Sequence, residues 1–327
     1  SRSKGVASLI VRMNTSTNSN LNKSVEVDPV AKLIKANTWT NAFWPRMTTT
    51  KERHRLVFVM RNAERVDKVF GPEWLNTELE FGRFQPTDQN IPSSIKHLLP
   101  YTDFLFDPPI TMMGKYTAQM VGRTFAYRGA VPARIVCAPS LRCVQTASAI
   151  ANMMSVRCGI EYGLAEPYPW FPSKPGGYVT SDLIAPPVLQ SLGYDIDLNY
   201  IPLYSEEELK ASVEETEEGA FKRIEIVLRQ LSSTDRSGPL LIVGHAITLK
   251  IAERMANAGA ASPSVSTTAT LHKEEPVDFI ELGLRFPYGS VVSLVQSKKA
   301  THTFKIYRNL IPPLTYGEQF CSKPILD

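Results

Sequence analysis

Three short runs of almost unbroken apolar residues constrain the fold of this chain most strongly. They are LVFVM at residues 56–60, ARIVCA at 133–138 and LLIVG at 240–244. Strands that are covered on both faces of a parallel sheet have this composition, whereas a strand with one face in water alternates apolar and polar residues. The three runs therefore predict buried strands of one parallel sheet.

Helical patterns lie between and after these runs. The expected helices, each with its capping residues, are 112–127 after Thr111 and before Gly129, 141–154 after Ser140, and a single long helix at 208–231 that begins at a Ser205–Glu208 capping box. A further helix is expected after residue 245, and alternating residues at 289–296 and 301–309 predict a terminal antiparallel pair. This order predicts an α/β fold: a doubly wound, mostly parallel sheet with helices on both faces.

Two long inserts and a polar arm interrupt the pattern. The inserts, at about residues 71–110 and 163–204, are rich in proline and aromatic residues. Loops this long in a compact domain are usually functional, so we expect them to form a lid over the site. Residues 1–52 are rich in Asn, Ser, Thr and Lys and are expected to form an N-terminal arm outside a domain at residues 53–327.

Composition excludes several classes of function. The net charge of +4 is small for 327 residues and the longest basic-rich run is KERHR, so nucleic-acid binding is not expected. No run of apolar residues is long enough to span a membrane. The four cysteines lack metal-binding spacing, so we expect reduced thiols, a cytoplasmic location, and no metal or other cofactor.

Cationic and hydrogen-bonding residues follow each predicted strand. Arg61 and Arg65 come after the first, Arg142 lies in the first turn of the helix after the second, and His245 follows the third. In a parallel sheet these positions come together at the carboxyl ends of the strands. Guanidinium groups bind phosphate bidentately, and helix N-termini attract anions. Each residue alone would be an ordinary surface or structural group, but together they predict a phosphate site.

The motifs RNAERVD, APSLRCVQTA, GLAEP, VGHA and IPPLTYGE resemble, in this order, the histidine phosphatase superfamily, whose fold is that of the phosphoglycerate mutases. They are most similar to the phosphatase domains of the suppressor-of-T-cell-signalling (TULA) proteins and the ecdysteroid-phosphate phosphatases. The resemblance implies that Arg61, Arg65 and Arg142 hold phosphate. It also implies that His245 is the second catalytic histidine and that Glu166 donates a proton to the leaving group.

The nucleophilic histidine of that superfamily corresponds to Asn62 here, and the glycine after it corresponds to Ala63. A neutral imidazole has a lone pair that attacks phosphorus, whereas the nitrogen of an amide has none to offer. An Asn side chain still donates hydrogen bonds to phosphate oxygens. Losing a nucleophile costs on the order of 10⁵- to 10⁶-fold in turnover. The sequence therefore predicts phosphate binding without efficient catalysis.

Three other residues are candidates to replace the nucleophile. His54 lies at the opposite end of the predicted strand, roughly 25 Å away. Cys143 is beside Arg142, but the resembling family has a cysteine there without using it. His245 would require a rearranged site. Asn62 is either an engineered change or natural divergence, and the altered neighbour Ala63 favours divergence.

Three functions remain open from the sequence. The first is a pseudophosphatase that binds a phosphorylated ligand or protein, and the second is an active or weakly active phosphomonoesterase. The third is a non-catalytic dimerisation module, because the resembling domains form homodimers. Tyr168, Trp170 and Phe171 either line a pocket for a phosphotyrosine or another flat substrate, or pack their insert onto the sheet.

Overall fold

The computed structural model describes residues 56–80, 83–93, 104, 106–170, 183–212, 214–234, 238–258, 277–296, 303–308, 310–317 and 320–327. The predicted N-terminal arm at residues 1–52 lies outside these residues. So do parts of both predicted inserts.

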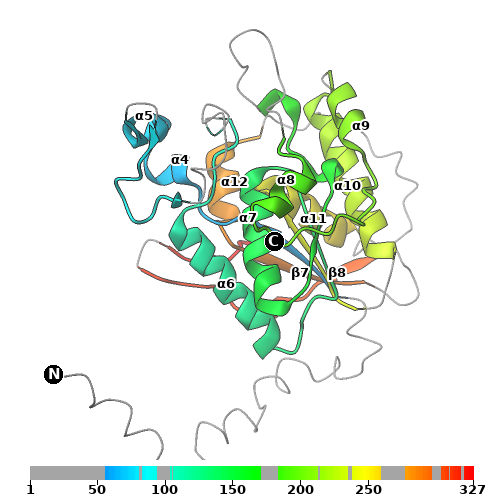
Figure 1. The fold of residues 1–327 in the computed structure, drawn as a ribbon. Coiled ribbons are helices and arrows are strands. Elements are labelled where there is room, and N and C mark those ends of the chain that lie inside the picture. Colours follow the sequence, from blue (N-terminus) through cyan, green and yellow to red (C-terminus); the bar gives the residue numbers. More distant parts are fainter. Residues whose placement is uncertain are drawn as a thin grey trace, which may run out of the picture. The chain divides into compact units, whose positions relative to one another are not determined.

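The described residues contain a six-stranded sheet in the order β5-β4-β6-β1-β7-β8 (Figure 1). The strands are β1 (Leu56–Arg61), β4 (Arg134–Cys137), β5 (Cys158–Ile160), β6 (Leu240–Gly244), β7 (Val291–Gln296) and β8 (Phe304–Ile306). Strands β5, β4, β6 and β1 run parallel to one another, and β7 is antiparallel to both of its neighbours, β1 and β8. This topology confirms the predicted mostly parallel sheet and its terminal antiparallel pair.

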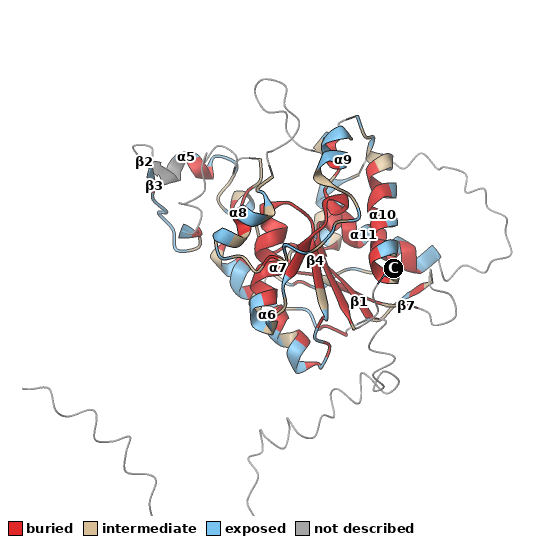
Figure 2. Cartoon of the chain, turned by 45° about the vertical axis from the view of Figure 1, so that its right-hand side comes forward, coloured by how far each residue is buried: buried red, intermediate tan, exposed pale blue. Residues whose placement is uncertain are grey.

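Helices cover both faces of the sheet. They are α4 (Val66–Val69), α5 (Trp74–Glu78), α6 (Met112–Tyr127), α7 (Leu141–Met154), α8 (Pro186–Ser191), α9 (Glu206–Ala211), α10 (Glu217–Ser233), α11 (Ala246–Ala258) and α12 (Phe279–Arg285), with 3-10 turns η3 (Tyr162–Leu164) and η4 (Tyr168–Trp170). Helix α7 packs on β4, β5 and β6 with α6 beside it, and α11 packs on β1, β6, β7 and β8 beside α10. Figure 2 shows these two helix pairs on opposite sides of the buried sheet.

The strands are apolar because both of their faces are covered. Phe58, Val59 and Met60 of β1 are fully buried. The Phe58 ring contacts Phe125 of α6 edge to face, with ring centroids 4.8 Å apart. Burying side chains of this size stabilises the fold by roughly 1.5–3 kcal/mol each. The core of the domain therefore lies along β1, β4 and β6, the strands that lead into the predicted site.

The prediction of one long helix at residues 208–231 is wrong. The capping box of Ser205 and Glu208 is present, but it begins the short helix α9. A second cap starts α10, because the Thr216 side chain accepts a hydrogen bond from the backbone N–H of Gly219. A side-chain oxygen that satisfies a free N–H competes with continuation of the preceding helix.

Both inserts contain short regular elements. The first holds α5 and a hairpin of β2 (Leu79–Glu80) and β3 (Arg83–Phe84), and the second holds η3, η4 and α8. In the first insert the side chain of Trp74 is buried against Phe84, with ring centroids 6.4 Å apart. That the inserts form a lid stays a prediction.

Candidate functional site: the ends of strands β1, β4 and β6

The carboxyl ends of the central strands converge, as the sequence predicted. The backbone N–H of Asn62, directly after β1, donates to the carbonyl of Gly244 at the end of β6 (2.8 Å). His245 follows Gly244, and its own N–H donates to the hydroxyl of Thr248 in α11 (3.0 Å). The side chain of His245 is thereby fixed at the start of α11, beside the start of α7.

Arg142 is the centre of a buried ion-pair cluster. Its side chain is 2% exposed, and its two terminal nitrogens bind different carboxylates. Nη1 donates to Asp107 Oδ1 at 2.8 Å, and Nη2 donates to Glu166. Burial alone would lower the pKa of Arg142, but the charges of Glu166 and Asp107 outweigh burial and raise it. The guanidinium is therefore charged at every accessible pH.

Asp107 was not foreseen from the sequence. It lies in the first insert, 35 residues before Arg142, and is followed by two prolines. The one available signal was an acidic residue just upstream of the capped helix α6, which by itself is too common to single out.

His245 is buried and neutral. Its Nδ1 lies 3.4 Å from Glu166 Oε2 and its Nε2 lies 3.4 Å from Ser140 Oγ. The pKa of His245 is lowered to about 3, chiefly by burial; Glu166 raises it, and the neighbouring arginines lower it. The His245 ring is therefore uncharged at neutral pH.

Glu166 is ionised in this arrangement. Burial favours its protonated form, but His245 when charged, Arg142 and Arg65 outweigh burial and lower the pKa of Glu166 to about 2. Since His245 is neutral at pH 7, the two arginines are the charges that keep Glu166 ionised at that pH. A proton donor must carry its proton, so Glu166 in this state binds Arg142 and has no proton to give.

Asn62 is 2% exposed and its side chain is engaged locally. Its Nδ2 donates to the carbonyl of Ala63 at 2.9 Å. The N–H of Ala63 donates to the hydroxyl of Thr146 in α7, also at 2.9 Å. The loop after β1 is thus tied to the helix that carries Arg142.

The other two predicted arginines have partners within the chain. Arg61 Nη1 donates to the carbonyls of Phe286 (2.6 Å) and Gly283 (3.4 Å), and its guanidinium stacks over Tyr288, 3.8 Å from the ring centre. Arg65 binds Asp67 through two hydrogen bonds of 2.9 Å. The side chain of Arg65 is 21% exposed, so it is reachable by a ligand from solvent.

The C-terminal motif IPPLTYGE reaches the same loop. Tyr316 donates through its hydroxyl to Glu64 Oε2 (3.2 Å), and Thr111 donates to Glu64 Oε1 (2.8 Å). Glu64, which lies between the two arginines, therefore joins the loop after β1 to the start of α6 and to the tail.

Cys143, one candidate to replace the nucleophile, is in an unfavourable protonation state. Burial raises the pKa of the Cys143 thiol to about 12, which leaves it protonated although its sulfur is 3.7 Å from His245 Nε2. A thiol must be deprotonated to attack. His54 lies outside the described residues.

Tyr168 and Trp170 pack the second insert onto the domain. The hydroxyl of Tyr168 donates to the carbonyl of Leu209 (2.6 Å), and the Trp170 ring contacts Phe221 and Phe279 edge to face at 6.0 and 4.9 Å. These contacts agree with the packing alternative. Phe171 lies outside the described residues, and a substrate-pocket role for the three aromatics stays a prediction.

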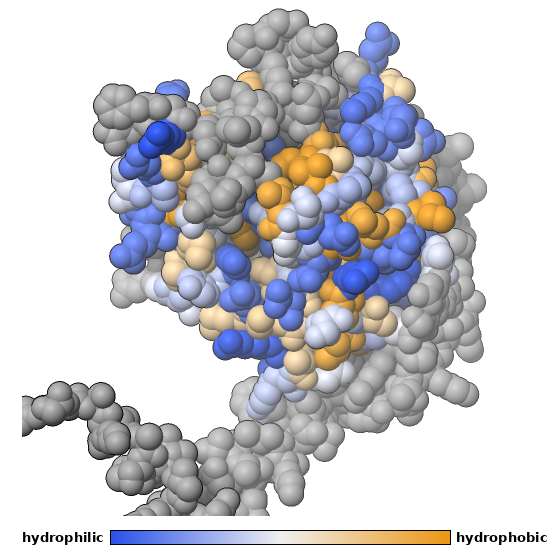
Figure 3. Space-filling view, in the orientation of Figure 1, coloured by the Kyte–Doolittle hydropathy of each residue, from blue (hydrophilic) through white to orange (hydrophobic). Residues whose placement is uncertain are grey.

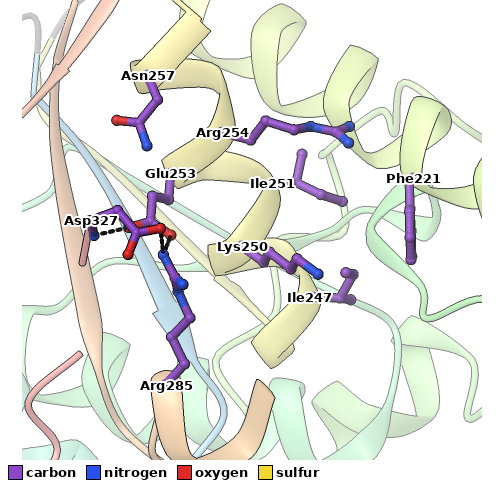
Figure 4. Close-up of a pocket in the computed structure, with 9 residues that line it drawn as sticks. All are labelled: Phe221, Ile247, Lys250, Ile251, Glu253, Arg254, Asn257, Arg285 and Asp327. Atoms are coloured by element: carbon purple, nitrogen blue, oxygen red, sulfur yellow. Dashed lines mark hydrogen bonds and ion pairs between the residues drawn. The ribbon is translucent and has the colours of Figure 1, made fainter. Parts of the chain in front are cut away.

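A separate cavity of about 270 Å³ lies beside α11 (Figure 4). Apolar side chains of Phe221, Ile247 and Ile251 line one part of it, and Arg285, paired with Glu253, borders another. None of the residues predicted for the phosphate site lines this cavity. On the face shown in Figure 3, apolar groups form several small patches among hydrophilic ones.

Comparisons with known proteins find phosphatases among the proteins that this chain resembles. No family model matches it. It is 28% identical over 228 residues to the ecdysteroid-phosphate phosphatase of Drosophila melanogaster, covering 68% of this chain and 29% of that protein. It is 32% identical over 207 residues to the Bombyx mori ecdysteroid-phosphate phosphatase (61% of this chain, 30% of that protein). The human ubiquitin-associated and SH3 domain-containing protein B is 28% identical over 273 residues (80% and 39%).

A solved structure shares the fold. The Bombyx mori ecdysone phosphate phosphatase in complex with tungstate superposes with a TM-score of 0.63 and 24% identity, covering 81% of this chain and 96% of that chain. The chain spans about 29–39% of the length of these curated relatives. The predicted resemblance is confirmed. Among the described residues, no helix is both long and apolar enough to cross a bilayer.

Proposed function

Because its relatives are phosphatases of the histidine phosphatase superfamily, we propose that this chain is a phosphate-binding pseudophosphatase. It binds a phosphorylated ligand or protein, and its own turnover is lost or strongly impaired. The observation that carries the proposal is the buried Asn62, whose amide is bonded to the Ala63 carbonyl. The resemblance matches this residue to the nucleophile of the superfamily.

Two further features support the loss of turnover. Covalent catalysis needs an atom with a free lone pair beside the phosphorus, and the amide nitrogen of Asn62 has none. The leaving oxygen needs a proton, and Glu166 is held as a carboxylate by Arg142. Restoring the nucleophile without the proton donor therefore gives at most a slow enzyme.

Phosphate binding is supported by the cations that remain. Arg142 lies at the start of α7, where the helix dipole and the backbone N–H groups of the first turn favour an anion. Arg61 and Arg65 flank Asn62 in the adjoining loop. The similar Bombyx mori enzyme was solved with tungstate, an oxyanion of phosphate-like shape.

The test is hydrolysis of an aryl phosphate by the native chain and by Asn62→His, together with calorimetric binding of inorganic phosphate. We expect the native chain to bind phosphate without measurable turnover. We expect Asn62→His to turn over more slowly than an ordinary phosphatase, because Glu166 is still ionised. Asn152→His, the same change at an exposed position of α7, is the matched control and should remain silent.

Turnover by the native chain at an ordinary phosphatase rate would make it a working phosphomonoesterase and overturn the proposal. Absence of phosphate binding would leave the dimerisation module as the better description. The homodimer expected from the resemblance and the cytoplasmic location expected from the cysteines are separate proposals. Sedimentation velocity tests the first, and imaging of the tagged chain in cells tests the second.

A further inference from the structure

Asp107 occupies the place where an anion would bind at the start of α7. Its Oδ2 accepts a hydrogen bond from the backbone N–H of Leu141 (2.6 Å), and its Oδ1 accepts from Arg142 Nη1 (2.8 Å). The Asp107 side chain is 14% exposed, so the carboxylate is largely shielded from water. A free N–H at a helix start together with a guanidinium is the donor set that binds phosphate in many proteins.

The usual capping residue does not compete for this position. Ser140 is the N-cap of α7, but its side chain makes no capping hydrogen bond. Its Oγ lies instead 3.4 Å from His245 Nε2. Asp107, from a distant part of the chain, therefore satisfies the N–H of Leu141.

Carboxylates already balance the cations of the site. Arg142 faces two of them, Asp107 and Glu166, and Arg65 is paired with Asp67. His245 contributes no charge at neutral pH. An incoming dianion therefore meets a cluster with little excess positive charge, in surroundings where like charges repel more strongly than in water.

We propose that Asp107 is an internal counter-anion that sets how tightly this site binds oxyanions and which charge state of the ligand it accepts. The inference rests on the proposed phosphate-binding function. A phosphate must share Arg142 and the start of α7 with Asp107, and repulsion between them weakens binding. Protonation of Asp107 removes that repulsion, so anion binding and proton uptake are linked.

The groups that face Asp107 agree with this linkage. Burial raises the pKa of Asp107, Arg142 and Arg65 lower it, and Glu166 raises it. A bound dianion would raise it further by repulsion. Glu166 and His245 have pKa values of about 2 and about 3 in the free chain, and a bound dianion raises these as well. The proton uptake that belongs to Asp107 is therefore the part that Asp107→Asn loses.

The test uses sulfate, which remains a dianion across the working pH range. Binding is measured by calorimetry for the native chain, Asp107→Asn and Asp107→Glu, with Glu225→Gln on the surface of α10 as an unrelated carboxylate control. Asp107→Asn keeps an oxygen for one of the two donors and removes the charge. We expect it to bind sulfate about tenfold more tightly at pH 7, whereas the other two variants should not bind more tightly than the native chain.

A second readout separates charge from structure. Titrations at pH 6 in two buffers of different ionisation enthalpy report the protons taken up with sulfate. The native chain should take up protons, and Asp107→Asn should take up fewer. If Asp107→Asn fails to fold, proton uptake by the native chain is the deciding measurement, because sulfate binding without proton uptake contradicts the inference.

The outcomes distinguish the two proposals. Equal or weaker sulfate binding by folded Asp107→Asn overturns the counter-anion role while leaving phosphate binding intact. Binding by Asp107→Asn but not by the native chain supports the counter-anion role and overturns the proposed function. Absence of binding in every variant overturns both.

Discussion

Arg142 neutralises two buried carboxylates and is also the guanidinium best placed at the start of α7 to hold a phosphate. Its removal therefore affects stability as well as binding. When a buried carboxylate loses its paired cation, its desolvation penalty is no longer offset by the ion pair. The same residue consequently cannot be changed to probe binding without a parallel measurement of unfolding.

Arg142→Met should abolish phosphate binding and lower the free energy of unfolding by about 3–5 kcal/mol, because Asp107 and Glu166 are left buried and unpaired. Urea denaturation measures the loss. Arg229→Met is the matched control, since Arg229 pairs with Glu225 at a more exposed position and such pairs contribute about 1 kcal/mol or less. Equal losses in the free energy of unfolding for the two variants would show that the buried cluster stabilises the fold no more than an exposed ion pair.

The sequence could bring Arg142, Glu166 and His245 into one site because strand ends and a family resemblance locate backbone positions. It could not identify Asp107, whose partners lie 34 and 35 residues further along the chain. Nor could it show that Arg61 turns toward the carbonyls of Gly283 and Phe286. Which donor meets which acceptor depends on packing that local pattern does not encode.

At the scale of elements, the close approach of α6 to the loop after β1 depends on Gly114. A Cβ at Gly114 would lie 2.8 Å from the backbone oxygen of Glu64 and 3.3 Å from the hydroxyl of Thr111. The backbone N–H of Thr111 also donates to that Glu64 oxygen (2.9 Å). The absence of a side chain at Gly114 thus lets α6 support the loop after β1 directly.

Gly114→Ala should push α6 away from this loop. We expect a loss of roughly 1–3 kcal/mol in the free energy of unfolding, as for other overpacked positions, together with weaker phosphate binding. Thermal unfolding and calorimetry measure the two effects. Gly219→Ala near the start of α10 is the control, because the nearest atoms there lie at 3.2 Å or more and belong to side chains. Stronger binding by Gly114→Ala would contradict the support role.

Element boundaries were predictable where one cap dominates, as for α6 with Thr111 at its start. The division between α9 and α10 was missed because acidic and apolar spacing continues through Thr216. Strand β5 was also missed, since it has only three residues and contains Gly159. Short strands gain their stability from neighbours in the sheet and carry little signal of their own.

At the scale of the whole molecule, the buried site makes the fold sensitive to acid. His245 has a pKa of about 3 in the folded chain and an ordinary value of 6.5 when exposed. Between these values the unfolded chain binds a proton that the folded chain does not, so stability falls as the pH is lowered from 6.5 toward 3. Glu166, ordinarily 4.5 and here about 2, adds a loss in the same direction below pH 4.5.

Replacing His245 with Gln should flatten the pH dependence of unfolding between about pH 6.5 and 4.5 by about one proton-equivalent. Urea titrations at several pH values give this slope, which is independent of any overall change in stability. Asn152→His, which adds a histidine at an exposed position of α7, is the control. It should leave the slope unchanged, because an exposed histidine binds protons equally in the folded and unfolded chains. An unaltered slope in His245→Gln would show that His245 is charged in the folded chain.

The position of β1 inside the sheet has a consequence for synthesis. Val57 of β1 pairs with Leu240 of β6 on one side and with Leu294 of β7 on the other. Both partners are translated long after β1, and pairing of such distant segments makes folding slow. An apolar strand with two unpaired edges is a template for association with other chains. The segment that supplies Arg61 and Asn62 therefore stays without its two partner strands until the ribosome has passed β6 and β7.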